Sequence, residues 1–157
     1  MKNSNISIRR ARVDDIKAIY LLLKSFSDQK LLLAKTEDQL FRLIRGFRVI
    51  EDTKSKEIVA CAHLDIFSEA LAEVKSLAVM QDYQGQGLGA QLVLDCEDEA
   101  RGMNIKKIFA LTYQVAFFEK LLYREVNIKT LPEKVFKECV ICPFFNECNE
   151  HALIKDI

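Results

Sequence analysis

The sequence predicts an α/β or α+β fold, with a mixed, mostly antiparallel central sheet of about six to seven strands flanked by helices. Strand-like segments dominate the first part of the chain, and a strand, helix, strand, helix, strand order follows in the middle. The 157 residues, of which 50% are hydrophobic, suit one compact domain. We therefore expect a single domain over 1–157, with 131–157 as a cysteine-rich C-terminal extension packed on it.

The N-terminal segment reads as a strand followed by a helix. Ile6 and Ile8 alternate with polar residues, which predicts a strand over 6–10. Asp14 then offers a carboxylate that can cap a helix. The apolar residues that recur along this helix with helical spacing are Ile16, Ile19, Tyr20 and Leu23.

A second helix and a hairpin follow. Thr36 and Gln39 have the spacing of a capping box, and they open a helix that carries Leu40, Phe41 and Ile44 and ends at Gly46. The polar stretch 51–56 lies between the β-rich segments 47–50 and 58–64. This pattern predicts a pair of antiparallel strands.

The middle of the chain alternates between strands and helices. A strand is predicted over 72–80, and a helix over 88–101 has an apolar residue at every fourth position before Gly102 closes it. A strand over 108–111, a helix over 115–122 and a strand over 124–128 come next. A helix that joins two strands implies at least one parallel pair.

Charge and composition exclude several classes of protein. The 23 basic residues balance the 23 acidic ones, so we expect neither a nucleic-acid partner nor attachment to an anionic membrane surface. The N-terminus carries no apolar stretch typical of a signal peptide, and no apolar run approaches the roughly 20 residues that cross a bilayer. We expect a cytoplasmic protein, in which the five cysteines are buried or bind metal rather than form disulfides.

Three alternating glycines, Gly85, Gly87 and Gly89, lie between a predicted strand and the start of a predicted helix. Such a turn exposes backbone N–H groups at the positive end of a helix dipole, where a phosphate or pyrophosphate can bind. The spacing is neither that of a P-loop nor that of a dinucleotide-binding fold. The alternative is a glycine turn used only for tight packing of the strand against the helix.

The residues around the glycines resemble the GNAT superfamily of acyl-CoA N-acyltransferases. The resemblance rests on Glu73–Val79, on Gln84-x-x-Gly87-x-Gly89, and on Phe117–Leu121 followed by Tyr123. It implies the GNAT fold and acetyl-CoA as co-substrate, with the pyrophosphate in the glycine turn and pantetheine along the preceding strand. The residues that it assigns to acetyl-CoA are Leu77, Ala78, Val79, Gln84, Gly85, Gln86, Gly87, Leu88, Gly89 and Ala90.

The same resemblance implies the parts of a direct acetyl transfer. Glu73 matches the position where some members place a general base, which an enzyme needs because amines are mostly protonated at neutral pH. A backbone N–H near Leu77 or Ala78 would stabilise the oxyanion. Phe118 occupies the position of the tyrosine that many members use as general acid, so either Tyr113 or Tyr123 serves or the thiolate leaves unassisted. Leu122 stands where the family has a glycine.

The acceptor amine is indicated by other segments. Residues 31–40, 47–51 and 131–135, with Cys139-x-x-Cys142-Pro143, resemble the acetyltransferase domain of N-acetylglutamate synthases, particularly the short type. This resemblance implies transfer to the α-amino group of L-glutamate, the first step of arginine biosynthesis. Lys35 and Thr36 would bind a substrate carboxylate, and Lys75, expected on the strand face of Glu73, would bind a second one or Glu73 itself.

Two alternatives remain open at this point. The protein acetylates a different amine, such as a polyamine, another small amine or a protein N-terminus, or it is a non-catalytic acyl-CoA sensor. Glutamate requires a cation such as Lys35, whereas a polyamine requires clustered acidic groups. The sequence leaves a homodimer open.

The C-terminal tail carries Cys139, Cys142, Cys148 and His151, which are enough ligands for a tetrahedral structural zinc. The alternative is that the thiols are buried as small hydrophobic groups. Cys61 and Cys96 fall on apolar faces, so we expect both in the core, and we expect His63 to pack within its strand.

Overall fold

The computed structural model describes residues 5–142 and 150–157, and they form a seven-stranded mixed sheet with the strand order β1-β2-β3-β4-β5-β7-β6. By their internal contacts they divide into two compact units. The first contains the residues up to Leu64 and Val74–Asp98, and the second contains Asp65–Glu73 and Glu99–Ile157. The predicted fold class is confirmed. Within the described residues no helix is long and apolar enough to cross a membrane.

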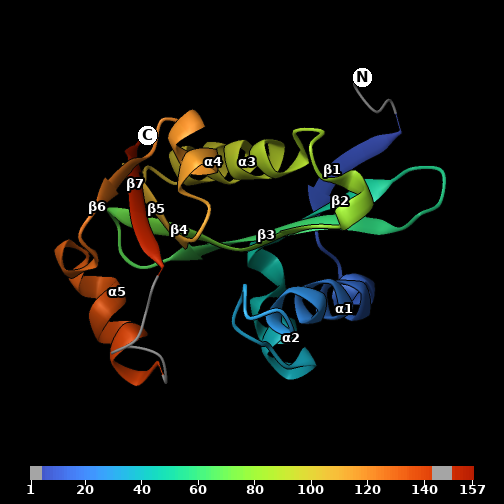
Figure 1. The fold of residues 1–157 in the computed structure, drawn as a ribbon, viewed down its shortest axis with the longest axis horizontal. Helices are drawn as coiled ribbons and strands as arrows, with labels where there is room; N and C mark the ends of the chain where they lie inside the picture. The colour runs from blue at the N-terminus through green and yellow to red at the C-terminus, as the bar shows by residue number, and fades with distance from the viewer. Residues whose placement is uncertain (1–4, 143–149) are drawn as a thin grey trace. The chain divides into compact units, whose positions relative to one another are not determined.

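The first unit starts with β1 (Ile6–Arg10), β2 (Phe47–Asp52) and β3 (Ile58–Ile66), which pair antiparallel in this order. The hairpin of β2 and β3 is the one that the sequence predicts. Helices α1 (Ile16–Ser27) and α2 (Glu37–Leu43) lie on one side of these strands, and α3 (Leu88–Gly102) starts on the other side (Figure 1).

Two predicted helix starts have different outcomes. The capping box of α2 is confirmed, because the Gln39 backbone N–H donates to Thr36 Oγ1 at 3.2 Å and the Thr36 N–H donates to Gln39 Oε1 at 2.9 Å. The cap that we predicted at Asp14 is wrong. Asp14 is exposed, and the neighbouring Asp15 instead accepts the Arg12 N–H at 2.7 Å and two bonds from the Arg9 guanidinium.

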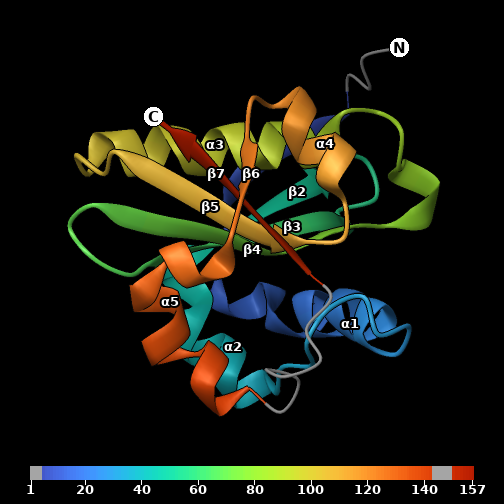
Figure 2. The ribbon, with the colours of Figure 1, turned by 60° about the vertical axis from the view of Figure 1, so that its left-hand side comes forward.

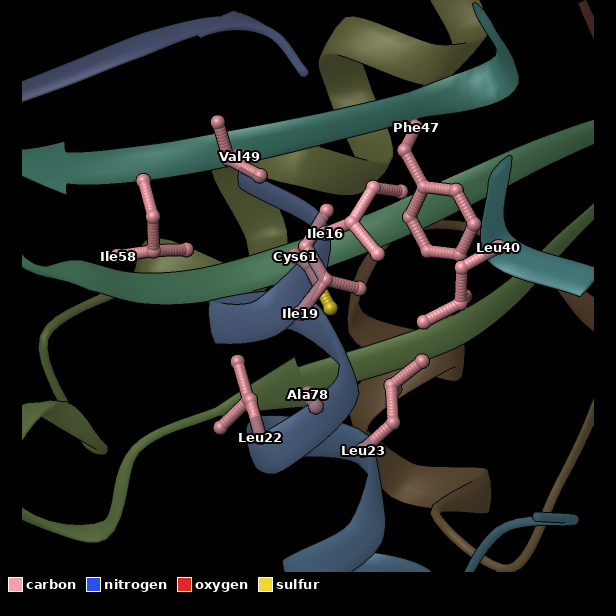
Figure 3. Close-up of a cluster of buried hydrophobic side chains, with 10 residues drawn as sticks. All are labelled: Ile16, Ile19, Leu22, Leu23, Leu40, Phe47, Val49, Ile58, Cys61 and Ala78. Carbon is pink, nitrogen blue, oxygen red and sulfur yellow. The ribbon is translucent and has the colours of Figure 1, made fainter. Parts of the chain in front are cut away.

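The core of the first unit forms where α1 and α2 pack on the strands (Figure 3). Ile19, Leu40 and Phe47 are completely buried. Cys61 lies among them, and burial raises the pKa of its thiol to about 12. Cys96 is buried as well, so the prediction that both cysteines belong to the core is confirmed.

The second unit is built on β5 (Lys107–Thr112), β7 (His151–Asp156) and β6 (Arg124–Val126). Strand β7 pairs antiparallel with both of the others. The start of β4 (Leu71–Val79) pairs parallel with β5, from Leu71 opposite Lys107 to Glu73 opposite Phe109. Helices α4 (Val115–Lys120) and α5 (Pro132–Lys137) lie on opposite sides of β5 and β7 (Figure 2). The sequence did not predict β7.

Leu122 keeps the turn after α4 although it replaces a glycine. Its φ is +71°, in the left-handed region, and its side chain is 78% exposed. An L-residue with this backbone conformation costs roughly 1–2 kcal/mol, whereas glycine adopts it freely.

We therefore expect Leu122→Gly to raise the free energy of unfolding by about 1 kcal/mol, because little packing is lost and the strain is relieved. Urea denaturation of the purified protein measures this change. Leu122→Ala is the matched control, since it removes the same exposed side chain but keeps the Cβ that causes the strain. Equal gains from the two variants would contradict the explanation by backbone strain.

Candidate functional site

The glycine turn precedes α3, as predicted. Gly85 has a φ of +76° and Gly87 has a φ of +81°, which L-residues rarely adopt. A Cβ placed on either glycine would meet no atom within 4 Å. Tight packing therefore does not explain these two glycines. The backbone conformation requires them, and it leaves open space above the N-terminus of α3, where an anion is favoured.

The turn is connected to its neighbours by side-chain hydrogen bonds. Gln84 Nε2 donates to the Val79 carbonyl at 3.0 Å, which joins the end of β4 to the turn. Tyr83, in the 3-10 turn Gln81–Tyr83, donates its hydroxyl to Asp52 Oδ2 at 2.9 Å. The pKa of Asp52 lies below its ordinary value, because the Lys54 backbone N–H and the Tyr83 hydroxyl both donate to its carboxylate. The hydrogen bond from Gln84 to Val79 thus links the two segments predicted to bind acetyl-CoA, 77–79 and 84–90.

Strand β4 is irregular at Ser76, whose φ is +53°. The carbonyl of Ser76 accepts from the Cys61 thiol at 3.5 Å. A left-handed residue interrupts the pleat of a strand, so the simple alternation that places Lys75 on the face of Glu73 does not continue across Ser76 to Leu77 and Val79. The side chain of Ala78 is buried in the core beside Leu22 and Leu23, whereas Leu77 and Val79 are half-buried (Figure 3). Ala78 therefore offers its backbone, not its side chain, to any ligand.

Glu73, the predicted general base, is 2% exposed and lies within the β4 segment that pairs with β5. Lys134 of α5 donates to Glu73 Oε2 at 3.0 Å and also contacts the carboxylate of Glu138. The sequence offered Lys75 as an ionic partner for Glu73 and gave no indication of Lys134. The two residues are 61 positions apart, and no local pattern joins them.

The residues predicted to hold glutamate lie in the first unit. Thr36 is exposed, and its hydroxyl oxygen accepts the capping hydrogen bond from the Gln39 N–H of α2. Lys35 and Lys75 are half-buried. Among the remaining acetyl-CoA candidates, Leu88 is buried at the start of α3, whereas Gln86 is exposed and Gly89 and Ala90 are half-buried. The role of each in binding stays a prediction.

The aromatic residues considered for the general acid differ in exposure. Phe118 and Tyr123 are both buried and stack edge to face, with ring centroids 5.1 Å apart. Tyr113 is 46% exposed. Of the two tyrosines, Tyr113 has the more exposed side chain.

The cysteine tail has no common centre in the described part of the chain. Cys139 is buried, Cys142 is half-buried, and Cys148 lies outside the described residues. His151 Nδ1 contacts Glu125 Oε1 of β6. Within 5–142 and 150–157, the groups that gather closely enough to share an ion are Asp65, Glu73 and Glu138. The zinc site predicted from the tail stays a prediction without support.

The family model described as the acetyltransferase (GNAT) family matches residues 13–122. The chain belongs to the GNAT family. The match includes β4, the glycine turn and α3, and it ends before α5 and β7. The GNAT chain is thus an acetyl-CoA-dependent N-acetyltransferase, and the alternative of a non-catalytic acyl-CoA sensor is dropped.

Some relatives match this chain over their whole length, and others match it over about a third of their own length. An uncharacterized N-acetyltransferase of Chlorobaculum tepidum is 27% identical over the full length of both chains. The amino-acid acetyltransferase of Edwardsiella ictaluri is 33% identical over 81% of this chain, which spans 29% of that relative. The structure of N-acetylglutamate synthase from Neisseria gonorrhoeae, complexed with coenzyme A and N-acetyl-glutamate, has a TM-score of 0.82 and 27% identity, and the match covers 99% of this chain and 36% of the synthase.

Proposed function

We propose that this GNAT enzyme transfers the acetyl group of acetyl-CoA to the α-amino group of L-glutamate. The observation that carries the proposal is the 33% identity to an amino-acid acetyltransferase over 81% of this chain. The 0.82 TM-score to an N-acetylglutamate synthase that contains coenzyme A and N-acetyl-glutamate supports it. Lys35, just before the N-cap residue of α2, would provide the positive charge that a glutamate carboxylate requires.

In the proposed binding mode, acetyl-CoA uses elements of the first unit. The pyrophosphate accepts hydrogen bonds from backbone N–H groups of the turn 84–90. Gly85 and Gly87, which have positive φ, present no side chains there. The pantetheine arm runs along residues 77–79 of β4. The backbone N–H of Leu77 or Ala78, just beyond the irregularity at Ser76, then donates to the thioester carbonyl oxygen.

The proposed reaction is a direct transfer. The unprotonated amine attacks the thioester carbonyl carbon, a C–N bond forms, the C–S bond breaks, and the CoA thiolate leaves. Glu73 takes the proton that the amine releases. Because its carboxylate is almost completely buried, we propose that a water molecule relays this proton. A CoA thiolate can leave without a general acid, since the pKa of a thiol is about 8.5.

A second candidate acceptor is a cationic amine such as a polyamine. The observation that favours it is the acidic surrounding of Glu73: the carboxylates of Asp65, Glu73 and Glu138 have ligand atoms within 4.8 Å of one another. Lys134 contacts two of these carboxylates, so the group keeps a net negative charge, which attracts a cation and repels the side-chain carboxylate of glutamate. The described residues therefore contain both a cation suited to glutamate and an acidic cluster suited to a polyamine.

Release of free thiol from acetyl-CoA decides between the two acceptors. We expect glutamate to be acetylated with a kcat/KM at least about tenfold above that of glutamine and of spermidine, because a charge-assisted hydrogen bond to Lys35 contributes roughly 1.5–3 kcal/mol. Lys35→Met should raise the KM for glutamate, and Lys35→Arg should restore it. Turnover with spermidine and none with glutamate would overturn the proposal in favour of the second candidate.

A further inference from the structure

Helix α5 brings a lysine into contact with the proposed base. The side chains of Lys134 and Glu73 are only 8% and 3% exposed, and Lys134 Nζ lies 3.0 Å from Glu73 Oε2. The contact lies wholly within the second unit. Lys134 follows the part of the chain that matches the GNAT family model. Nothing in the family match therefore predicts this pair.

The ammonium group of Lys134 is held on two further sides. Its Nζ contacts the carboxylate of Glu138, one helical turn later, and lies 5.5 Å from the centre of the Phe67 ring. The neighbouring Lys137 lies 5.7 Å from the same ring and donates to the backbone carbonyl of Phe67. The contacts of Lys134 with Glu138 and Phe67 restrict the position of its ammonium group, and with it the orientation of the Glu73 carboxylate, whereas Lys137 contacts Phe67.

Lys134 stays charged in this environment. Burial lowers the pKa of its ammonium group, but the nearby carboxylates of Glu73 and Glu138 more than offset that effect, so the pKa lies above its ordinary value. A lysine that keeps its proton through neutral and mildly alkaline pH acts as a fixed positive charge. It therefore favours the ionised form of the carboxylate that it contacts.

The other charged groups around Glu73 are mostly acidic. Asp65 and Glu138 share the cluster with it, and Glu150 is near enough for the charge of Lys134 to act on its pKa, which burial raises overall. Neighbouring carboxylates hinder the loss of a proton from Glu73. Among the described residues, the charged groups close to Glu73 or to Lys134 include Asp65 at the end of β3, Glu138 just after α5 and Glu150 just before β7.

We propose that Lys134 is a positioning residue, which holds the carboxylate of Glu73 oriented and ionised so that it can accept the proton of the acceptor amine. The inference rests on the proposed role of Glu73 as general base. It adds that a residue of α5, outside the family match, sets the pH range in which this base works. Acidic neighbours alone would keep Glu73 protonated to higher pH, and Lys134 counteracts them.

The pH dependence of kcat/KM tests the proposal. In Lys134→Met the positive charge is lost, proton loss from Glu73 becomes harder, and the acid limb of the profile moves to higher pH by about one to three units. Lys134→Arg keeps the charge and returns the limb close to its wild-type position. Lys137→Met, on the same helix and over the same Phe67 ring, is the matched control and leaves the limb unchanged. If Lys134→Met lowered the maximal kcat/KM but left the acid limb at its wild-type pH, Lys134 would have a purely structural role and the proposal would be overturned.

Glu138→Gln should shift the acid limb in the opposite direction, and this second test remains valid even if Lys134→Met fails to fold. Glu138 is 37% exposed in its side chain, so its substitution is tolerated more readily. Removing this carboxylate makes proton loss from Glu73 easier, and the acid limb moves to lower pH. A limb that stays in place or moves upward contradicts the proposal.

Carbon-13 NMR of the glutamate side-chain carboxyls gives a readout without turnover, with Glu73→Gln identifying the Glu73 resonance. Its titration midpoint should rise in Lys134→Met and fall in Glu138→Gln. Unchanged midpoints overturn the role of Lys134 even if the enzyme acetylates glutamate. Shifted midpoints in a protein that acetylates no amine of the panel would support the role of Lys134 in ionising Glu73 and overturn the proposed function alone.

Discussion

Glu73→Gln lowers kcat by roughly a hundredfold or more, because general base catalysis contributes about 10²–10⁴-fold and an amide cannot take the proton from the amine. The KM for acetyl-CoA changes little, since neither the glycine turn nor residues 77–79 are altered. Steady-state kinetics at saturating acetyl-CoA measure the effect. Circular dichroism confirms that the variant is folded despite the loss of one partner of Lys134.

Asp65→Asn is the matched control for this prediction. Asp65 belongs to the same acidic cluster and carries the same charge, so a general loss of negative charge would affect both variants alike. We expect a change in kcat of less than about tenfold for Asp65→Asn, well below the contribution of a base. Similar losses in the two variants would show that the cluster acts through its charge and that Glu73 is not the base.

Gly87→Val weakens acetyl-CoA binding by roughly a hundredfold. Its φ of +81° is strained for a β-branched residue, and the new side chain projects into the open space above the turn. If two backbone N–H groups lose the pyrophosphate, each charge-assisted hydrogen bond accounts for about 1.5 kcal/mol, and together they account for the hundredfold change. Isothermal titration with CoA measures the dissociation constant directly.

Gly102→Ala provides the control for the glycine turn. Gly102 ends α3 without a positive φ, and a Cβ there would also meet no atom within 4 Å. The variant should bind CoA as the wild type does. If Gly87→Val bound CoA with unchanged affinity while remaining folded, the assignment of the pyrophosphate to this turn would be wrong.

Local patterns predicted those parts of the molecule that depend on neighbouring residues. The capping box of Thr36 and Gln39, the hairpin of β2 and β3, and the glycine turn each arise from residues a few positions apart, so propensity and spacing suffice. Asp15 rather than Asp14 occupies the N-cap position of α1, and its carboxylate binds the Arg12 N–H and the Arg9 guanidinium of β1 instead of capping the helix. That choice depends on tertiary structure.

The features that the sequence did not reveal depend on distant residues or on strain. The contact of Glu73 with Lys134 crosses 61 positions, and it became visible only when α5 was placed beside the start of β4 within the second unit. Ser76 and Leu122 adopt positive φ although neither is a glycine. Residue type gives no signal at Ser76, and at Leu122 the signal came only from the glycine that the family has at this position. The surrounding structure imposes both conformations.

The position of β7 between β5 and β6 has a consequence for folding on the ribosome. Strand β6 precedes β7 in the chain, yet the recorded pairing joins each of β5 and β6 to β7. Neither strand can complete this hydrogen bonding until residues 151–156 have been synthesised. Contacts between residues so far apart in the sequence form slowly, because a long loop must close first. The second unit therefore completes its sheet only after translation has passed β7, and until then the strand edges that β7 will cover are open to pairing with other chains.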